Sequence, residues 1–187
     1  MDTLSFIKQN EGYAISDAVK TGVPASITMG QAIIESGHGN SRLYQIANNT
    51  FGIKCHSDWK GPSVRANDDA PNECFRKYDS VKESFRDHSK FLKENSRYKK
   101  LFELDPSDYK SWARGLKQAG YATAPNYDTA LISIIEQFKL QDLDRKVKTR
   151  RTLRKILIPL VLVLLLIVAI IMYYKFRQRA TLKPILA

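Results

Sequence analysis

The sequence predicts an α+β fold dominated by helices, followed by one C-terminal transmembrane helix. Apolar residues recur at helical spacing through most of the first 144 residues, and a central stretch rich in Gly, Pro and Asn interrupts that pattern. A run of 19 uncharged residues follows near the C-terminus. We therefore expect a domain over residues 1–144, a basic juxtamembrane linker over 145–155, a transmembrane helix over 156–174 and a basic tail over 175–187.

The excess positive charge is confined to the C-terminal part of the chain. Residues 1–144 contain 19 Lys and Arg and 19 Asp and Glu, whereas residues 145–187 contain 11 Lys and Arg and no acid. A domain without a basic excess lacks the electrostatic footprint of nucleic-acid binding. Basic residues beside an apolar run instead indicate contact with anionic lipid headgroups, so membrane lipid is an expected partner.

The uncharged run over residues 156–174 is long enough to cross a bilayer. As a helix it would extend about 28 Å, close to the ~30 Å thickness of the hydrocarbon core. Pro159 falls in its first turn, and Tyr173 and Tyr174 lie where an interfacial aromatic belt is expected. Seven basic residues precede the run and four follow it, which favours an N-terminal domain on the cytoplasmic side. The first residues also lack the apolar core of a secretory signal.

Capping residues and apolar spacing predict six helices in the domain. Thr3 or Ser5 is expected to cap the first helix, and Pro24 to open the second. Ser80 and Glu83 form the pattern of a capping box before the fourth. The expected ranges are 3–20, 24–36, 41–46, 80–94, 105–120 and 126–143.

Residues 48–79 interrupt the helical pattern and predict a small irregular β-lobe. Gly, Pro and Asn separate two strand-like runs, at residues 50–55 and 73–78. A helical body and a small β-lobe would leave a cleft between them, in which an extended ligand could bind.

Glu35 is the residue that the pattern alone singles out for chemistry. It lies at the C-terminal end of an apolar helix, after Ile33 and Ile34 and before a glycine-containing turn. The negative end of the helix dipole and apolar neighbours both disfavour the charged carboxylate, which raises its pKa toward that of a general acid. The alternative is a solvated glutamate at a helix end.

Four ordered segments resemble the glucosaminidases of glycoside hydrolase family 73. The segment QAIIESGHGNS at residues 31–41 resembles the catalytic motif of these peptidoglycan hydrolases, which include flagellar rod-cap hydrolases and many autolysins. Further matches follow in the same order at residues 48–54, 75–80 and 120–127.

The resemblance implies a lysozyme-like fold and hydrolysis of the glycosidic bond on the reducing side of N-acetylglucosamine in peptidoglycan glycan strands. Glu35 takes the role of general acid, and Tyr121 matches a cleft tyrosine that supports substrate or the catalytic water. Tyr121 could equally brace the helices as a core aromatic. The expected substrate-binding residues in these motifs are Ser36, His38, Asn49, Phe51 and Tyr127. We expect no cofactor, and the Cys and His spacing is poor for a metal ion.

Two departures from the family pattern leave alternatives open. Ala124 stands where the family has Asp, and no Glu aligns cleanly with the second acid of the β-lobe. Asp69 is favoured for that role over Asp68 and Glu73, unless the substrate's own N-acetyl group assists. The alternative function is a catalytically weak or inactive wall-binding or assembly module of a larger membrane complex.

The two cysteines, Cys55 and Cys74, lie at the edges of the predicted β-lobe. We expect them to form a disulfide, because a wall substrate requires an oxidising compartment, although two reduced, packed cysteines are the alternative. The same substrate predicts a single-pass protein of the bacterial inner membrane with its domain in the periplasm. This location conflicts with the charge bias around the apolar run.

Overall fold

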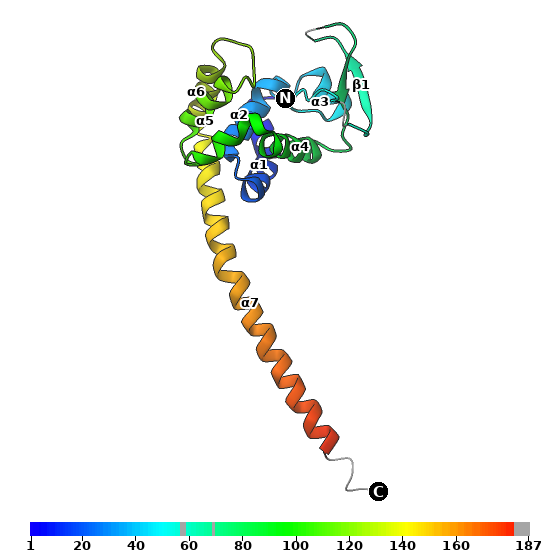
Figure 1. The fold of residues 1–187 in the computed structure, drawn as a ribbon, viewed down its shortest axis with the longest axis vertical. Coiled ribbons are helices and arrows are strands. Elements are labelled where there is room, and N and C mark those ends of the chain that lie inside the picture. Colours follow the sequence, from blue (N-terminus) through cyan, green and yellow to red (C-terminus); the bar gives the residue numbers. More distant parts are fainter. Residues whose placement is uncertain (57–58, 69, 182–187) are drawn as a thin grey trace. The chain divides into compact units, whose positions relative to one another are not determined.

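The computed structural model describes residues 1–56, 59–68 and 70–181, and it contains two compact units, Met1–Val147 and Lys148–Ala187. Helices dominate the first unit, which also holds a two-stranded sheet (Figure 1). This confirms the predicted helix-dominant α+β fold. The elements are α1 (Thr3–Thr21), α2 (Ala25–Ser36), α3 (Arg42–Ala47), β1 (Ser63–Ala66), β2 (Glu73–Arg76), α4 (Val81–Glu94), η1 (Ser96–Glu103), α5 (Tyr109–Gln118), α6 (Tyr127–Gln137) and α7 (Gln141–Thr181).

The predicted N-terminal caps are not formed as expected at two helices. Helix α1 is capped by Asp2, whose carboxylate accepts a hydrogen bond from the Ser5 amide at 3.0 Å, and not by Thr3 or Ser5 itself. Ser80 precedes α4 without making a side-chain cap bond, so the predicted capping box with Glu83 is incomplete.

The prediction of a single helix over residues 126–143 was wrong. Helix α6 ends at Gln137, and Lys139 adopts a positive φ of 51° before α7 begins at Gln141. Helix α7 then continues through the predicted basic linker and the apolar run. The 3-10 helix η1 was not predicted at all, and it forms one wall of a pocket described below.

The β-lobe holds one hairpin, in which β1 and β2 pair antiparallel along their whole length. The other predicted strand-like run, over residues 50–55, is not a strand. Only Lys54 forms an isolated bridge, to Phe75 of β2. Figure 1 shows the hairpin beside α3.

A disulfide closes the lobe internally, and an ion pair and a hydrogen bond tie β2 and the residues after it to the helical body. Cys55 and Cys74 are bonded, with Cα atoms 5.3 Å apart, as the sequence predicted. The buried Arg76 guanidinium lies 3.0 Å from Asp87 Oδ2 of α4, and the Tyr78 hydroxyl donates to the same oxygen at 2.7 Å. The contacts of Arg76 and Tyr78 with Asp87 fix the base of the hairpin on α4.

Helix α2 is the central helix of the first unit, and α1, α5 and α6 pack against it. Gly30 allows α6 to approach closely, because a Cβ atom there would lie 2.7 Å from Leu131 Cδ1. At the next residue, Gln31 Nε2 donates to the Tyr127 hydroxyl at 2.9 Å. The close approach therefore brings an α6 tyrosine to the end of α2 that carries Glu35.

The N-terminal end of α2 is capped by a residue of α7, near the end of the domain sequence. Pro24 provides no side-chain cap, and Asp144 Oδ1 of α7 instead accepts from the Ser26 amide at 3.1 Å. Leu143 and Val147, on the same turns of α7, are buried in the core. The first two turns of α7 are thus part of the domain, which extends to Val147.

Replacing Asp144 with Ala is expected to lower the free energy of unfolding by about 1 kcal/mol, because the Ser26 amide loses its acceptor. Asp144→Asn keeps an acceptor oxygen and should stay near wild type. Asp142→Ala, at a neighbouring side chain that is paired with Arg145 and half exposed, is the matched control. Chemical denaturation followed by tryptophan fluorescence measures the difference. Equal stability of the Ala and Asn variants would contradict the capping role.

Helix α7 contains the segment that meets the length and composition needed to cross a membrane. The span covers Gln141–Arg177, with a mean hydropathy of 3.3 in its most apolar window. The large apolar side chains from Ile156 to Tyr173 are about half exposed, and none is buried in the protein.

Candidate active site

Glu35 lies on the last turn of α2, which ends at Gly37 in a left-handed conformation with φ 53°. Its side chain is mostly buried, and burial is the largest cause of a pKa raised to about 7. The negative charge of Asp68 raises the pKa further, whereas a hydrogen bond with Tyr127 lowers it by less. A carboxyl group with this pKa holds its proton in a large fraction of molecules at neutral pH.

Two tyrosines surround the carboxyl group. Tyr127 is buried, receives the Gln31 hydrogen bond and contacts the Glu35 side chain. Tyr121 stacks on Tyr127, with ring centroids 5.6 Å apart. Burial raises the pKa of the Tyr121 hydroxyl well above its usual value, and the charges of Tyr127 and Glu35 raise it further. Both phenols therefore remain protonated donors beside Glu35.

Of the three predicted candidates for the second acid, the structure describes two. Asp69 lies outside the described residues, so its role stays a prediction. Lys54 Nζ lies 3.1 Å from Asp68 Oδ2 and 2.9 Å from Glu73 Oε1. Glu73 also accepts from the Ala70 amide, whereas the Asp68 carboxylate is half exposed and acts electrostatically on Glu35.

Three predicted substrate-binding residues are buried and already engaged inside the protein. The Ser36 hydroxyl donates to the Ala32 carbonyl at 2.6 Å and accepts from the Gly39 amide at 2.8 Å. Phe51 stacks on His88, with ring centroids 3.9 Å apart. These placements favour a supporting role for both residues over direct contact with a ligand.

The third of these residues, Asn49, organises the segment that was expected to be a strand. Its amide group donates to the carbonyl groups of Ile53 and Arg76 and accepts from the Ile53 amide, at 2.8–3.0 Å. The Ile53 carbonyl also accepts from the Arg76 amide of β2 at 2.9 Å, so Asn49 adds side-chain bonds to a backbone contact between this segment and β2. Asn49 is 1% exposed, and its predicted contact with substrate stays a prediction.

His38 is partly exposed on the turn after α2 and has a positive φ of 60°. Its Nδ1 lies 2.7 Å from the Thr3 hydroxyl, so the ring is held against the start of α1. Of the five predicted substrate-binding residues, only His38 retains an exposed surface near Glu35 in sequence.

Sequence reasoning missed two buried polar residues behind the site. Gln31 holds the Tyr127 hydroxyl, and its position one turn before Glu35 on the helix was the available signal. His88 is fully buried between Phe51 and Tyr121, and burial lowers its pKa to about 3. The neutral imidazole therefore serves as a packing group. Among the described residues, no cluster of three His, Cys, Asp or Glu side chains could hold a metal ion.

The sequence matches one protein family over most of its length. The profile of the glucosaminidase family, described as mannosyl-glycoprotein endo-beta-N-acetylglucosaminidase, matches residues 11–140. The chain is 37% identical over 150 residues to the exo-glucosaminidase LytG of Bacillus subtilis. The aligned region covers 74% of this chain and 52% of that protein. It is 31% identical over 146 residues to the peptidoglycan hydrolase FlgJ of Vibrio parahaemolyticus, covering 72% and 47% respectively. The chain thus spans about half the length of these relatives.

Solved structures show the same fold. A peptidoglycan hydrolase from Sphingomonas sp. A1 is similar with a TM-score of 0.65 and 31% identity, covering 76% of this chain and 94% of that one. The glycoside hydrolase domain of Salmonella typhimurium FlgJ gives a TM-score of 0.64 and 29% identity, covering 83% and 100%. The small sheet and the helical body therefore form the lysozyme-like fold that the sequence predicted.

Proposed function

Because the chain belongs to the glucosaminidase family, we propose that it is a peptidoglycan hydrolase that uses Glu35 as its general acid. The proposed reaction is hydrolysis, within the glycan strand, of the bond on the reducing side of N-acetylglucosamine. The observation that carries the assignment is the Glu35 carboxyl group, whose pKa burial and Asp68 raise to about 7. A general acid needs this property to donate its proton to the leaving oxygen near neutral pH.

A second carboxylate completes the proposed mechanism. An inverting glycosidase uses a base to activate water on the opposite face of the sugar. Among the described carboxylates of the β-lobe we assign this role to Asp68, because its charge reaches Glu35 and its side chain is half exposed. Tyr121 and Tyr127, both protonated, would donate hydrogen bonds to the substrate or hold Glu35 in place.

Digestion of purified sacculi tests the reaction. We expect soluble fragments longer than one disaccharide, with N-acetylglucosamine at their reducing ends, identified by borohydride reduction and mass spectrometry. Products of a single disaccharide would indicate exo cleavage, and muramic acid at the reducing ends would contradict the proposed bond. Binding to sacculi without release of fragments would instead support the wall-binding module.

We further propose that the apolar part of α7 anchors the chain in a bacterial inner membrane, with the domain outside the cytoplasm. The supporting observations are one helix of sufficient length and hydropathy, and exposed apolar side chains over residues 156–173. The chain should remain in the membrane pellet after alkaline carbonate extraction. Protease added to intact spheroplasts should digest the domain. Protection until lysis would place the domain inside, as the charge bias suggests.

A further inference from the structure

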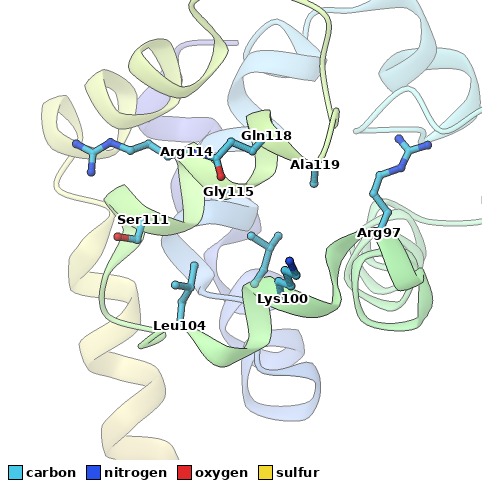
Figure 2. Close-up of a pocket in the computed structure, with 9 residues that line it drawn as sticks. Arg97, Lys100, Leu104, Ser111, Arg114, Gly115, Gln118 and Ala119 are labelled. Atoms are coloured by element: carbon cyan, nitrogen blue, oxygen red, sulfur yellow. The ribbon is translucent and has the colours of Figure 1, made fainter.

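A pocket of about 630 Å³ lies between η1 and α5, and none of the predicted site residues lines it (Figure 2). Its apolar floor comes from Leu101 and Leu104 of the η1 segment. Arg97 and Arg114 stand on opposite sides of the hollow in Figure 2, with Lys100 between them. The lining contains these three cations and no acid.

The cations of this pocket differ from Lys110 and Lys117 of α5 in forming no close ion pair among the described residues, although the charge of Arg114 acts on Asp108. Lys110 lies 2.7 Å from Glu136, and Lys117 lies 3.0 Å from Asp128, so α6 neutralises both. Within the described part of the chain, the three pocket cations form no ion pair. Unpaired guanidinium and ammonium groups around an apolar floor favour an anionic ligand that also carries small apolar groups.

Two short segments connect the pocket with the candidate active site. Ala119 lines the pocket, and Tyr121, two residues later, lies beside Glu35. The Arg97 guanidinium donates to the Gly120 carbonyl at 3.2 Å, and the next residue, Tyr98, packs on Tyr121 with ring centroids 6.2 Å apart. A branched ligand bound at Glu35 could therefore place a side branch in this pocket.

We propose that the pocket binds the carboxylate-bearing peptide branches of peptidoglycan, an inference that rests on the proposed substrate. These short peptides carry free carboxylates and alanine methyl groups, which match the cations and the apolar floor. Arg97, Lys100 and Arg114 would pair with the carboxylates, and Leu101 and Leu104 would contact the methyl groups. The pocket would thus select strands that still carry their peptides.

The test compares two double variants of the full chain in an uncharged detergent. Lys100→Gln with Arg114→Gln removes two charges from the pocket, and Lys8→Gln with Lys99→Gln removes two exposed charges elsewhere. On peptide-bearing strands the pocket variant should raise KM about tenfold with kcat unchanged, because it loses two charge-assisted contacts. On the same strands freed of peptide by an amidase, both variants should match wild type.

A direct binding measurement keeps the test independent of catalysis. The isolated acidic peptide should bind wild type and the control variant, but bind the pocket variant at least tenfold more weakly. Equal KM changes on both kinds of strand, or unchanged peptide binding, would overturn the proposal. So would displacement of the peptide by inorganic phosphate at the same concentration, which would identify a phosphate site. If wild type cleaves neither strand, the proposed function fails, and the peptide measurement still decides the pocket.

Discussion

Glu35→Gln should lower kcat/KM on peptidoglycan by about 10²–10⁴-fold, the usual contribution of a general acid. The amide is nearly isosteric with the acid, but it cannot donate a proton to the leaving oxygen. Binding to sacculi should persist. Glu103→Gln, at an exposed glutamate, removes the same charge and should leave the rate unchanged. Retained activity in the Glu35 variant would remove the proposed general acid.

The pH dependence of the wild-type rate follows from the same group. Since Glu35 must be protonated to act, and its pKa is about 7, kcat/KM should fall above about pH 7. The free energy of unfolding should also fall as the pH rises. The pKa of Glu35 in the folded state exceeds its ordinary value of 4.5. Its contribution to the free energy of unfolding is therefore complete below pH 4.5 and is lost as the pH rises through 7. The Gln variant should lack this loss, which thermal unfolding across pH 4 to 8 would reveal.

Asp68→Asn should produce the second large effect, a fall in kcat of about 10²-fold if Asp68 activates the water. It should also shift the alkaline limb of the pH profile to lower pH, because the negative charge that raises the Glu35 pKa is gone. Glu73→Gln is the matched comparison, since both carboxylates contact Lys54.

Two outcomes would separate the alternatives for the second carboxylate. A large loss in the Glu73 variant alone would reassign the base to that residue. Full activity in both variants would exclude both and would leave Asp69 or assistance by the substrate's N-acetyl group. In every case the shift of the pH profile shows whether the Asp68 charge raises the pKa of Glu35, whatever the change in rate.

The helices were largely predictable because apolar spacing and caps are local signals. The break between α6 and α7 was not, since Lys139 adopts its left-handed φ without the glycine that usually marks such a turn. The run over residues 50–55 had strand-like composition, but it meets β2 through an isolated bridge at Lys54, and the Asn49 side chain binds the Ile53 backbone from within the loop. Side-chain hydrogen bonds of this kind have no periodic signature.

For a related reason, the sequence indicated the role of some residues of the candidate site better than that of others. Glu35 could be found from its place at the end of an apolar helix, and the burial that raises its pKa agrees with the expected effect of its apolar neighbours, whereas the contribution of Asp68 was not foreseen. Ser36, Asn49 and Phe51 belong to the same family motifs, yet they are buried. A motif records residues that hold a loop together as well as residues that touch a ligand, and sequence alone does not separate the two. The distances and the burial of each side chain in the structure help to separate these two kinds of residue.

The contact of Asp144 with the start of α2 has a consequence for the modularity of the chain. The family match ends at residue 140, where a designer would join the enzyme to another anchor. A junction there would discard Asp144 together with the buried Leu143 and Val147. The domain and the proposed anchor can therefore be exchanged as separate parts only when the cut falls after Val147.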